Sequence, residues 1–90
     1  MFRLWGKILK NNMLVTDQVF ELESSDLSLE EKINKGMEKF CYQFDIQKPM
    51  WFSDNTSDMT QIGKTRFMDH HFIEEIDFDY LELDIIENKD

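Results

Sequence analysis

Hydrophobic and acidic residues alternate closely from residue 74 to the end of the chain. A repeat of two residues is typical of a β-strand with one buried face and one face toward solvent. The hydrophobic positions change parity between Tyr80 and Leu81, which indicates a bulge or a turn there, or a separate turn over residues 72–78. Helical spacing over residues 73–83 is also present, but the β-branched and aromatic residues favour a strand. We predict a strand from about Tyr80 to Glu87.

Two further strands are predicted at the N-terminus. Residues 2–8 alternate between two sets. One set is Phe2, Leu4, Gly6 and Ile8, and the other is Arg3, Trp5 and Lys7. Asn11 and Asn12 follow, and asparagine tolerates the left-handed backbone of tight hairpin turns. Alternation resumes over residues 13–22 and slips near Asp17-Gln18, which indicates a bulge. The segment therefore predicts an antiparallel hairpin.

The central segment predicts an amphipathic helix. Ser28 and Glu31 have the spacing of a capping box, in which each side chain bonds to the backbone of the other residue. Apolar residues then recur along one helical stripe: Leu29, Ile33, Met37, Phe40, Cys41 and Phe44. Gly36 lowers helix propensity, so we expect it to mark a close approach to the sheet. Pro49 requires the helix to end before it.

Residues 50–73 allow more than one interpretation. Residues 50–52 form either a short strand or an extended apolar segment. The polar stretch from residue 53 is either a loop or a short helix that Ser53 or Asp54 caps and that runs to about Ile62. Residues 64–67 are compatible with a strand and residues 69–71 with a turn.

These elements predict one α+β domain over residues 1–90. The N-terminal hairpin and the C-terminal strand form a small antiparallel sheet, with a candidate short middle strand. One central amphipathic helix packs on this sheet. We further predict that the C-terminal strand pairs with the N-terminal one.

Composition and charge exclude several classes of protein. The chain is 41% hydrophobic and 13% aromatic, which is too apolar for a disordered acidic segment. Its net charge of −9 argues against nucleic acid and anionic membranes as partners. No apolar run is long enough to span a membrane, the N-terminus does not resemble a signal peptide, and Cys41 is the single cysteine. We therefore expect a cytoplasmic protein.

The charge is unevenly distributed along the chain. Residues 74–90 contain eight acids and one lysine, a net of −7, whereas residues 1–16 contain three bases and no acid. One interpretation is that the two ends are neighbouring strands with opposite charges. Another is that the acids bind a basic partner. The candidate partner-binding residues are then Glu82, Asp84, Glu87 and Trp5.

A second cluster has the chemistry of metal ligands. Asp69, His70, His71, Glu74 and Glu75 lie close together in the sequence, and imidazole with carboxylate suits zinc or iron. Adjacent histidines of an extended chain point to opposite faces, which weakens the pattern. A solvated polar turn is the alternative interpretation. Cys41 could pair with a histidine as a nucleophile, but its place on the apolar stripe favours a core position.

The order of several motifs resembles a group of short bacterial proteins known only as hypothetical. The residues that carry the resemblance lie at positions 2–7, 41–45, 48–51, 64–67 and 72–81. The resemblance covers nearly the whole chain. It implies no activity, no cofactor and no site residue.

The sequence thus favours a non-enzymatic interaction or accessory protein. It would present the acidic C-terminal strand to a basic protein partner and would require no cofactor. Three alternatives remain open. They are a small metal-binding protein or metal-dependent enzyme, a structural homodimer formed through an open sheet edge, and a mimic of the nucleic-acid backbone.

Overall fold

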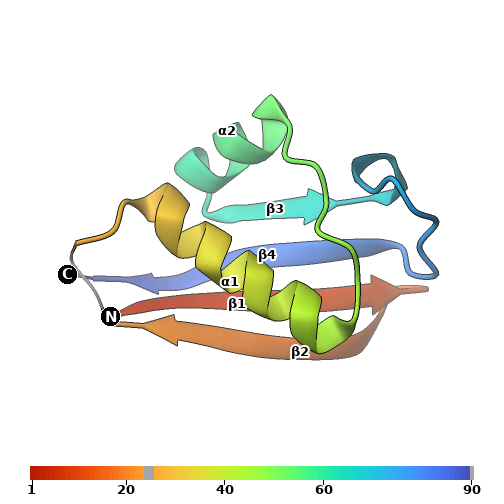
Figure 1. Cartoon of the computed structure of the whole chain (residues 1–90), viewed down its shortest axis with the longest axis horizontal. Coiled ribbons are helices and arrows are strands. Elements are labelled where there is room, and N and C mark those ends of the chain that lie inside the picture. Colours follow the sequence, from red (N-terminus) through yellow and green to blue (C-terminus); the bar gives the residue numbers. More distant parts are fainter. Residues whose placement is uncertain (24–25, 90) are drawn as a thin grey trace.

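The computed structural model describes residues 1–23 and 26–89, which fold into a four-stranded antiparallel sheet and two α-helices (Figure 1). The elements are β1 (Phe2–Lys10), β2 (Met13–Leu22), α1 (Leu29–Phe44), α2 (Ser53–Gln61), β3 (Lys64–Phe67), the short 3-10 helix η1 (Asp69–His71) and β4 (Tyr80–Asn88). The strand order is β2-β1-β4-β3. The predicted α+β fold is confirmed. No helix of the described residues is long and apolar enough to cross a membrane.

The N-terminal hairpin has the predicted turn. Asn11 and Asn12 adopt positive φ angles of 54° and 63°. The bulge lies elsewhere than predicted, because Leu9 pairs with Leu14 and leaves Val15 as the extra residue. Gln18 pairs regularly with Gly6. The alternation of apolar and polar residues is interrupted at Gln18 because this polar residue pairs with Gly6. The register of the two strands does not shift there.

The pairing of the two ends of the chain is confirmed. β4 runs antiparallel to β1, with Leu81 opposite Ile8 and Leu83 opposite Gly6. The parity change has a simple cause, since β4 begins only at Tyr80 and the residues before it form bends. The helical interpretation of residues 73–83 is wrong. A second register shift near Arg3 leaves Ile86 as an extra residue.

Helix α1 lies across one face of the sheet (Figure 1). Its capping box is present, with the Glu31 amide donating to Ser28 Oγ at 3.2 Å and the Ser28 amide donating to Glu31 Oε1 at 3.1 Å. It ends at Asp45, which has a left-handed φ of 54°. A Cβ on Gly36 would lie 2.7 Å from Leu4 Cδ2. The predicted close approach of Gly36 to the sheet is confirmed.

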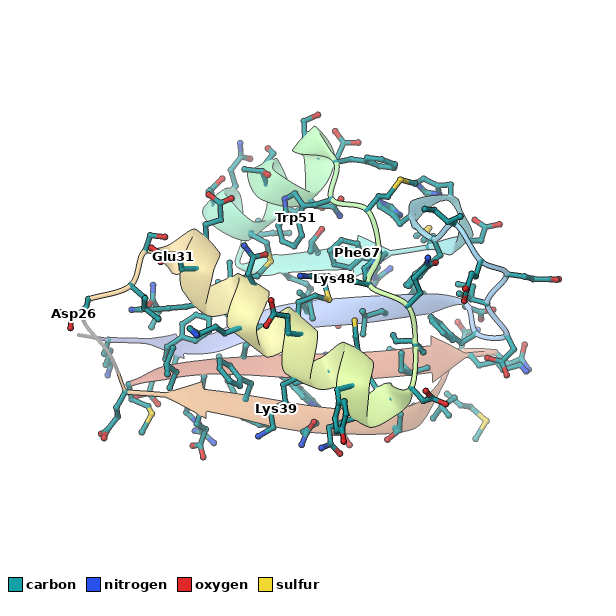
Figure 2. All side chains as sticks on the ribbon, in the orientation of Figure 1. Asp26, Glu31, Lys39, Lys48, Trp51 and Phe67 are labelled. Carbon is teal, nitrogen blue, oxygen red and sulfur yellow. The ribbon has the colours of Figure 1, made fainter. Side chains whose placement is uncertain are left out.

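The middle of the chain resolves into a helix and an edge strand. The predicted short helix is present as α2, but neither Ser53 nor Asp54 caps it. Phe52 occupies the cap position, and its amide donates to Asn55 Oδ1 at 2.9 Å. Residues 50–52 form no strand, and β3 supplies the fourth strand instead. Trp51 packs between the helices and the sheet, 5.3 Å from the ring of Phe67 (Figure 2).

Asn55 joins α2 to β3 through side-chain hydrogen bonds. It is buried, and its Nδ2 donates to Thr65 Oγ1 at 2.8 Å and to the Arg66 carbonyl at 3.2 Å. Thr65 in turn donates to Asp58 Oδ2 at 3.0 Å. Thr65 lies on the same face as the core residue Phe67, so α2 covers the same face of the sheet as α1.

We expect Asn55→Ala to lower the free energy of unfolding by about 2 kcal/mol, because it leaves buried donors and acceptors unpaired. Urea denaturation followed by circular dichroism measures this change. The matched control is Asn34→Ala on the exposed side of α1, which should change stability by less than about 0.5 kcal/mol. Equal stability of the two variants would contradict the role of Asn55.

Candidate functional site

The side chains proposed for partner binding lie on the sheet face that the two helices leave uncovered. Along β1, the buried Phe2, Leu4 and Ile8 alternate with side chains that point to this opposite face. We call it the outer face. Its charged residues and its tryptophan and valine are Arg3, Trp5 and Lys7 of β1, Asp17, Val19 and Glu21 of β2, Glu82, Asp84 and Glu87 of β4, and Lys64 and Arg66 of β3.

Glu82 lies at the centre of the outer face, between two cations. Its carboxylate is 2.7 Å from Lys7 Nζ and 2.9 Å from Arg66 Nε. The side chains from the two flanking strands cover it, so that Glu82 is only 5% exposed. Burial opposes ionisation, but the hydrogen bonds from Lys7 and Arg66 outweigh it and lower the pKa of Glu82. Glu82 is therefore an internal counter-ion and is not available to a partner, in contrast to the expectation.

The other acids of β4 are also close to cations. Asp84 lies 3.8 Å from both Lys7 Nζ and Lys64 Nζ, and Glu87 lies 3.9 Å from Arg3. The interpretation of the two chain ends as neighbouring strands with opposite charges is confirmed. Spaced acids that neighbouring cations neutralise do not reproduce the field of a nucleic-acid backbone. The outer face therefore gives no support to the mimic.

Trp5 shares the outer face with Arg3 and Lys7 of the same strand. Its indole Nε1 donates to Asp17 Oδ2 at 2.8 Å, and Lys7 Nζ lies 3.9 Å from the ring centroid. These contacts fix the ring between Asp17 of β2 and the Lys7 ammonium group. Trp5 thus links the central ion pair of the sheet to the edge strand β2.

The five metal-ligand candidates do not converge on one point. Glu74 and Glu75 are exposed, and the amide of Glu74 donates to Gln47 Oε1 at 3.0 Å. His70 is exposed, and its ring lies tilted by 41° against that of His71 with 4.1 Å between the ring centroids. Over residues 1–23 and 26–89, no group of three or more His, Cys, Asp or Glu side chains is arranged to hold a metal ion.

The environment of His71 gives a physical reason against metal binding there. His71 is buried between Phe52 and Phe67, and its Nδ1 accepts a hydrogen bond from the Met68 amide at 3.0 Å. The proton of the neutral ring is therefore on Nε2, and neither nitrogen offers a lone pair. Burial, together with the neighbouring His70, lowers the pKa of His71, which keeps the ring neutral.

Cys41 is a core residue, as the helical stripe predicted. It is buried in the apolar cluster under α1. Burial raises the pKa of the thiol to about 11, so the nucleophilic thiolate is scarce at neutral pH. The structure gives no support to a catalytic pair with a histidine.

The sequence interpretation named an open sheet edge only for a homodimer and did not identify β2 as that edge. Within the part of the chain that the structure describes, β2 pairs only with β1, and its first five residues are exposed. Met13, Leu14 and Val15 are exposed to 70%, 50% and 59%. Asp17 and Glu21 are the only charged residues in the strand. The signal available in the sequence was the absence of lysine and proline from residues 13–22, because natural proteins use these residues to protect free edges.

Three kinds of comparison with known proteins provide no relative from which a function could be transferred. Models of known protein families, curated proteins and solved structures contain no match to this chain. The resemblance to short bacterial proteins therefore stays a prediction, and function is inferred from the geometry of the chain itself.

Proposed function

We propose that the protein is a non-enzymatic interaction protein that binds an extended basic segment of a partner protein along the free edge of β2. The observation that carries this proposal is the ten-residue edge strand with acidic charges alone. The proposal keeps the basic partner that the sequence indicated. It moves the binding surface from β4, whose acids are covered within the sheet, to β2, where Glu21 lies 3.0 Å from Arg3 Nε but keeps a side chain that is 56% exposed.

An added strand would find hydrogen-bonding groups and side-chain contacts on β2. The edge of a sheet presents backbone N–H and C=O groups that an extended peptide can pair with. The bulge at Val15 interrupts regular pairing, so the continuous stretch is Thr16 to Leu22. The exposed Leu14 and Val15 directly precede this stretch and supply apolar area.

Charge favours a basic segment over a second copy of the same strand. Asp17 and Glu21 both point to the outer face, with Val19 between them on the same face. In an added strand, lysine or arginine at the opposing positions would contribute about 0.2–1 kcal/mol per pair, whereas like charges would oppose pairing. An antiparallel copy of β2 brings acids and no bases.

The two tryptophans of the chain allow a direct test by NMR. The probe is an acetylated peptide of alternating lysine and valine, and the matched control peptide replaces lysine with glutamate. We expect the lysine peptide to shift the amide resonances of residues 16–22 and the indole resonance of Trp5, which bonds to Asp17 in β2. The indole resonance of Trp51 should stay unchanged. Higher ionic strength should weaken binding.

The variant Glu21→Gln should weaken binding of the lysine peptide about two- to fivefold, as expected for a partly exposed ion pair. Glu38→Gln removes the same charge from α1 and serves as the control. Binding that Glu21→Gln leaves unchanged, or shifts confined to other elements, would overturn the proposal. Sedimentation that shows a dimer formed through β2 would favour the homodimer instead.

A further inference from the structure

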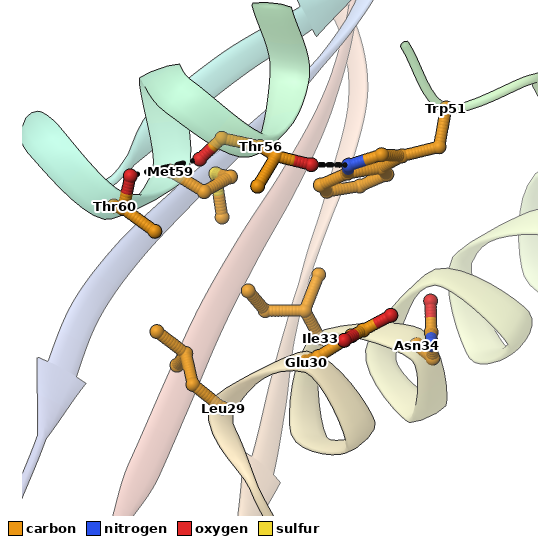
Figure 3. A pocket seen from close by; sticks show the side chains of 8 residues that line it. All are labelled: Leu29, Glu30, Ile33, Asn34, Trp51, Thr56, Met59 and Thr60. Atoms are coloured by element: carbon orange, nitrogen blue, oxygen red, sulfur yellow. Dashed lines mark hydrogen bonds between the residues drawn. The ribbon is translucent and has the colours of Figure 1, made fainter. Parts of the chain in front are cut away.

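A preformed cleft between α1 and α2 has a composition that neither the fold nor the proposed function explains. Its volume is about 340 Å³, near the lower end of the range for small-ligand sites of roughly 300–1,000 Å³. It lies on the helical side of the sheet, away from the outer face. Figure 3 shows its lining, with Trp51, Thr56, Met59 and Thr60 on one side and Leu29, Glu30, Ile33 and Asn34 on the other.

The floor of the cleft is apolar and belongs to the core. Ile33 and Met59 are both 4% exposed and form part of the hydrophobic core cluster. Leu29 packs against the same cluster at the start of α1. A ligand that enters the cleft would therefore bury apolar surface against a floor that already has its final shape.

Trp51 forms a fixed wall that remains 37% exposed. Its Nε1 donates to Thr56 Oγ1 at 2.7 Å, and its ring packs against Phe67. These contacts hold the indole in place without hiding it. A fixed, exposed indole is the best aromatic partner for a cation, since its ring face carries negative potential.

Among residues 1–23 and 26–89, Glu30 is the only charged side chain that lines the cleft. Among the described residues, no lysine or arginine forms an ion pair with it, whereas Glu38 on the same helix lies 3.5 Å from Lys48. Its position in the first turn of α1 suits the helix dipole. The helix dipole explains why an acid is favourable at this position. It does not explain why the exposed ring of Trp51 lines the same cleft.

We propose that this cleft binds a small organic amine, with the apolar body on Ile33 and Met59 and the ammonium group between Glu30 and the Trp51 ring. Three features select this class of ligand together. They are an apolar floor, an unpaired carboxylate at the rim and an exposed aromatic face. This inference is independent of strand addition at β2.

The test compares 2-phenylethylamine with 2-phenylethanol, which has nearly the same shape and no charge. We expect the amine to produce saturable shifts in the methyl resonances of Ile33 and Met59 and in the Trp51 indole resonance. The Trp5 indole resonance should not move. The alcohol should bind about two- to fivefold more weakly, because it lacks the attraction of a cation to Glu30 and to the Trp51 ring.

Two variants separate the cleft from nonspecific attraction to an acidic protein. Glu30→Gln should remove the part of the preference for the amine that the carboxylate supplies, and Glu38→Gln should leave amine binding unchanged. Asn34→Trp places a large side chain at the exposed rim and should abolish the shifts while the fold persists. Equal affinities for amine and alcohol, or a loss with Glu38→Gln equal to that with Glu30→Gln, would overturn the proposal. If the lysine-valine peptide occupied the cleft and the amine did not, the proposal would also be overturned.

Discussion

Gly6→Ala will lower the free energy of unfolding by about 3 kcal/mol, the upper end of the usual range for an overpacked core. A Cβ at this position would lie 2.6, 2.7 and 2.8 Å from three ring carbons of Phe40. Phe40 is fully buried and stacks on Phe44, so its ring has no free space to enter. The gain that alanine normally brings within a strand is too small to compensate. Urea denaturation at neutral pH measures the loss.

Gly36→Ala is the matched control on the other side of the same interface. Its Cβ would lie 2.7 Å from Leu4 Cδ2, the end of a flexible side chain, and 3.1 Å from Phe20 Cδ2. Alanine also improves helix propensity by about 1 kcal/mol. We therefore expect Gly36→Ala to cost less than half as much as Gly6→Ala. Adding Phe40→Leu to Gly6→Ala should recover part of the lost stability, and a purely additive double mutant would refute the proposed clash.

Local patterns in the sequence were sufficient to predict the main elements. Alternation identified β1 and β4, the capping box placed the start of α1, and two asparagines located the hairpin turn. The opposite charges of the two chain ends correctly predicted that β1 and β4 are neighbours. Each of these features depends on residues within one strand or helix, or on one pair of strands. A local sequence pattern is therefore sufficient to predict it.

The environments of Glu82 and Trp51 could not be predicted in the same way. Alternation correctly placed Glu82 on the face opposite to the core, but its burial depends on the long side chains of both flanking strands. One of these, Arg66, belongs to β3, whose existence the sequence left open. The wall that Trp51 forms depends on the crossing of two helices. Such tertiary arrangements leave no periodic signal in the chain.

Glu82→Ala is expected to lower the free energy of unfolding by about 3 kcal/mol at neutral pH, the lower end of the range for breaking a buried ion pair. The change leaves Lys7, whose side chain is only 13% exposed, without its closest counter-ion. It also removes the hydrogen bond to Arg66. Glu87→Gln is the control, because its contact with Arg3 is 3.9 Å long and partly exposed. Such a contact contributes at most about 1 kcal/mol.

The pH dependence of the same ion pair provides a more specific test. The hydrogen bonds from Lys7 and Arg66 outweigh the effect of burial and lower the pKa of Glu82 in the folded protein below its usual value of 4.5. A lowered folded-state pKa means that the unfolded chain binds more protons in this range, so stability falls as the pH decreases. The contribution is complete above pH 4.5 and disappears as the pH falls through the folded-state pKa. Glu82→Gln, which cannot ionise, should therefore unfold with a shallower acid dependence than the unmodified protein. Parallel stability curves for the two proteins between neutral and acid pH would show that Glu82 is not the internal counter-ion of the sheet.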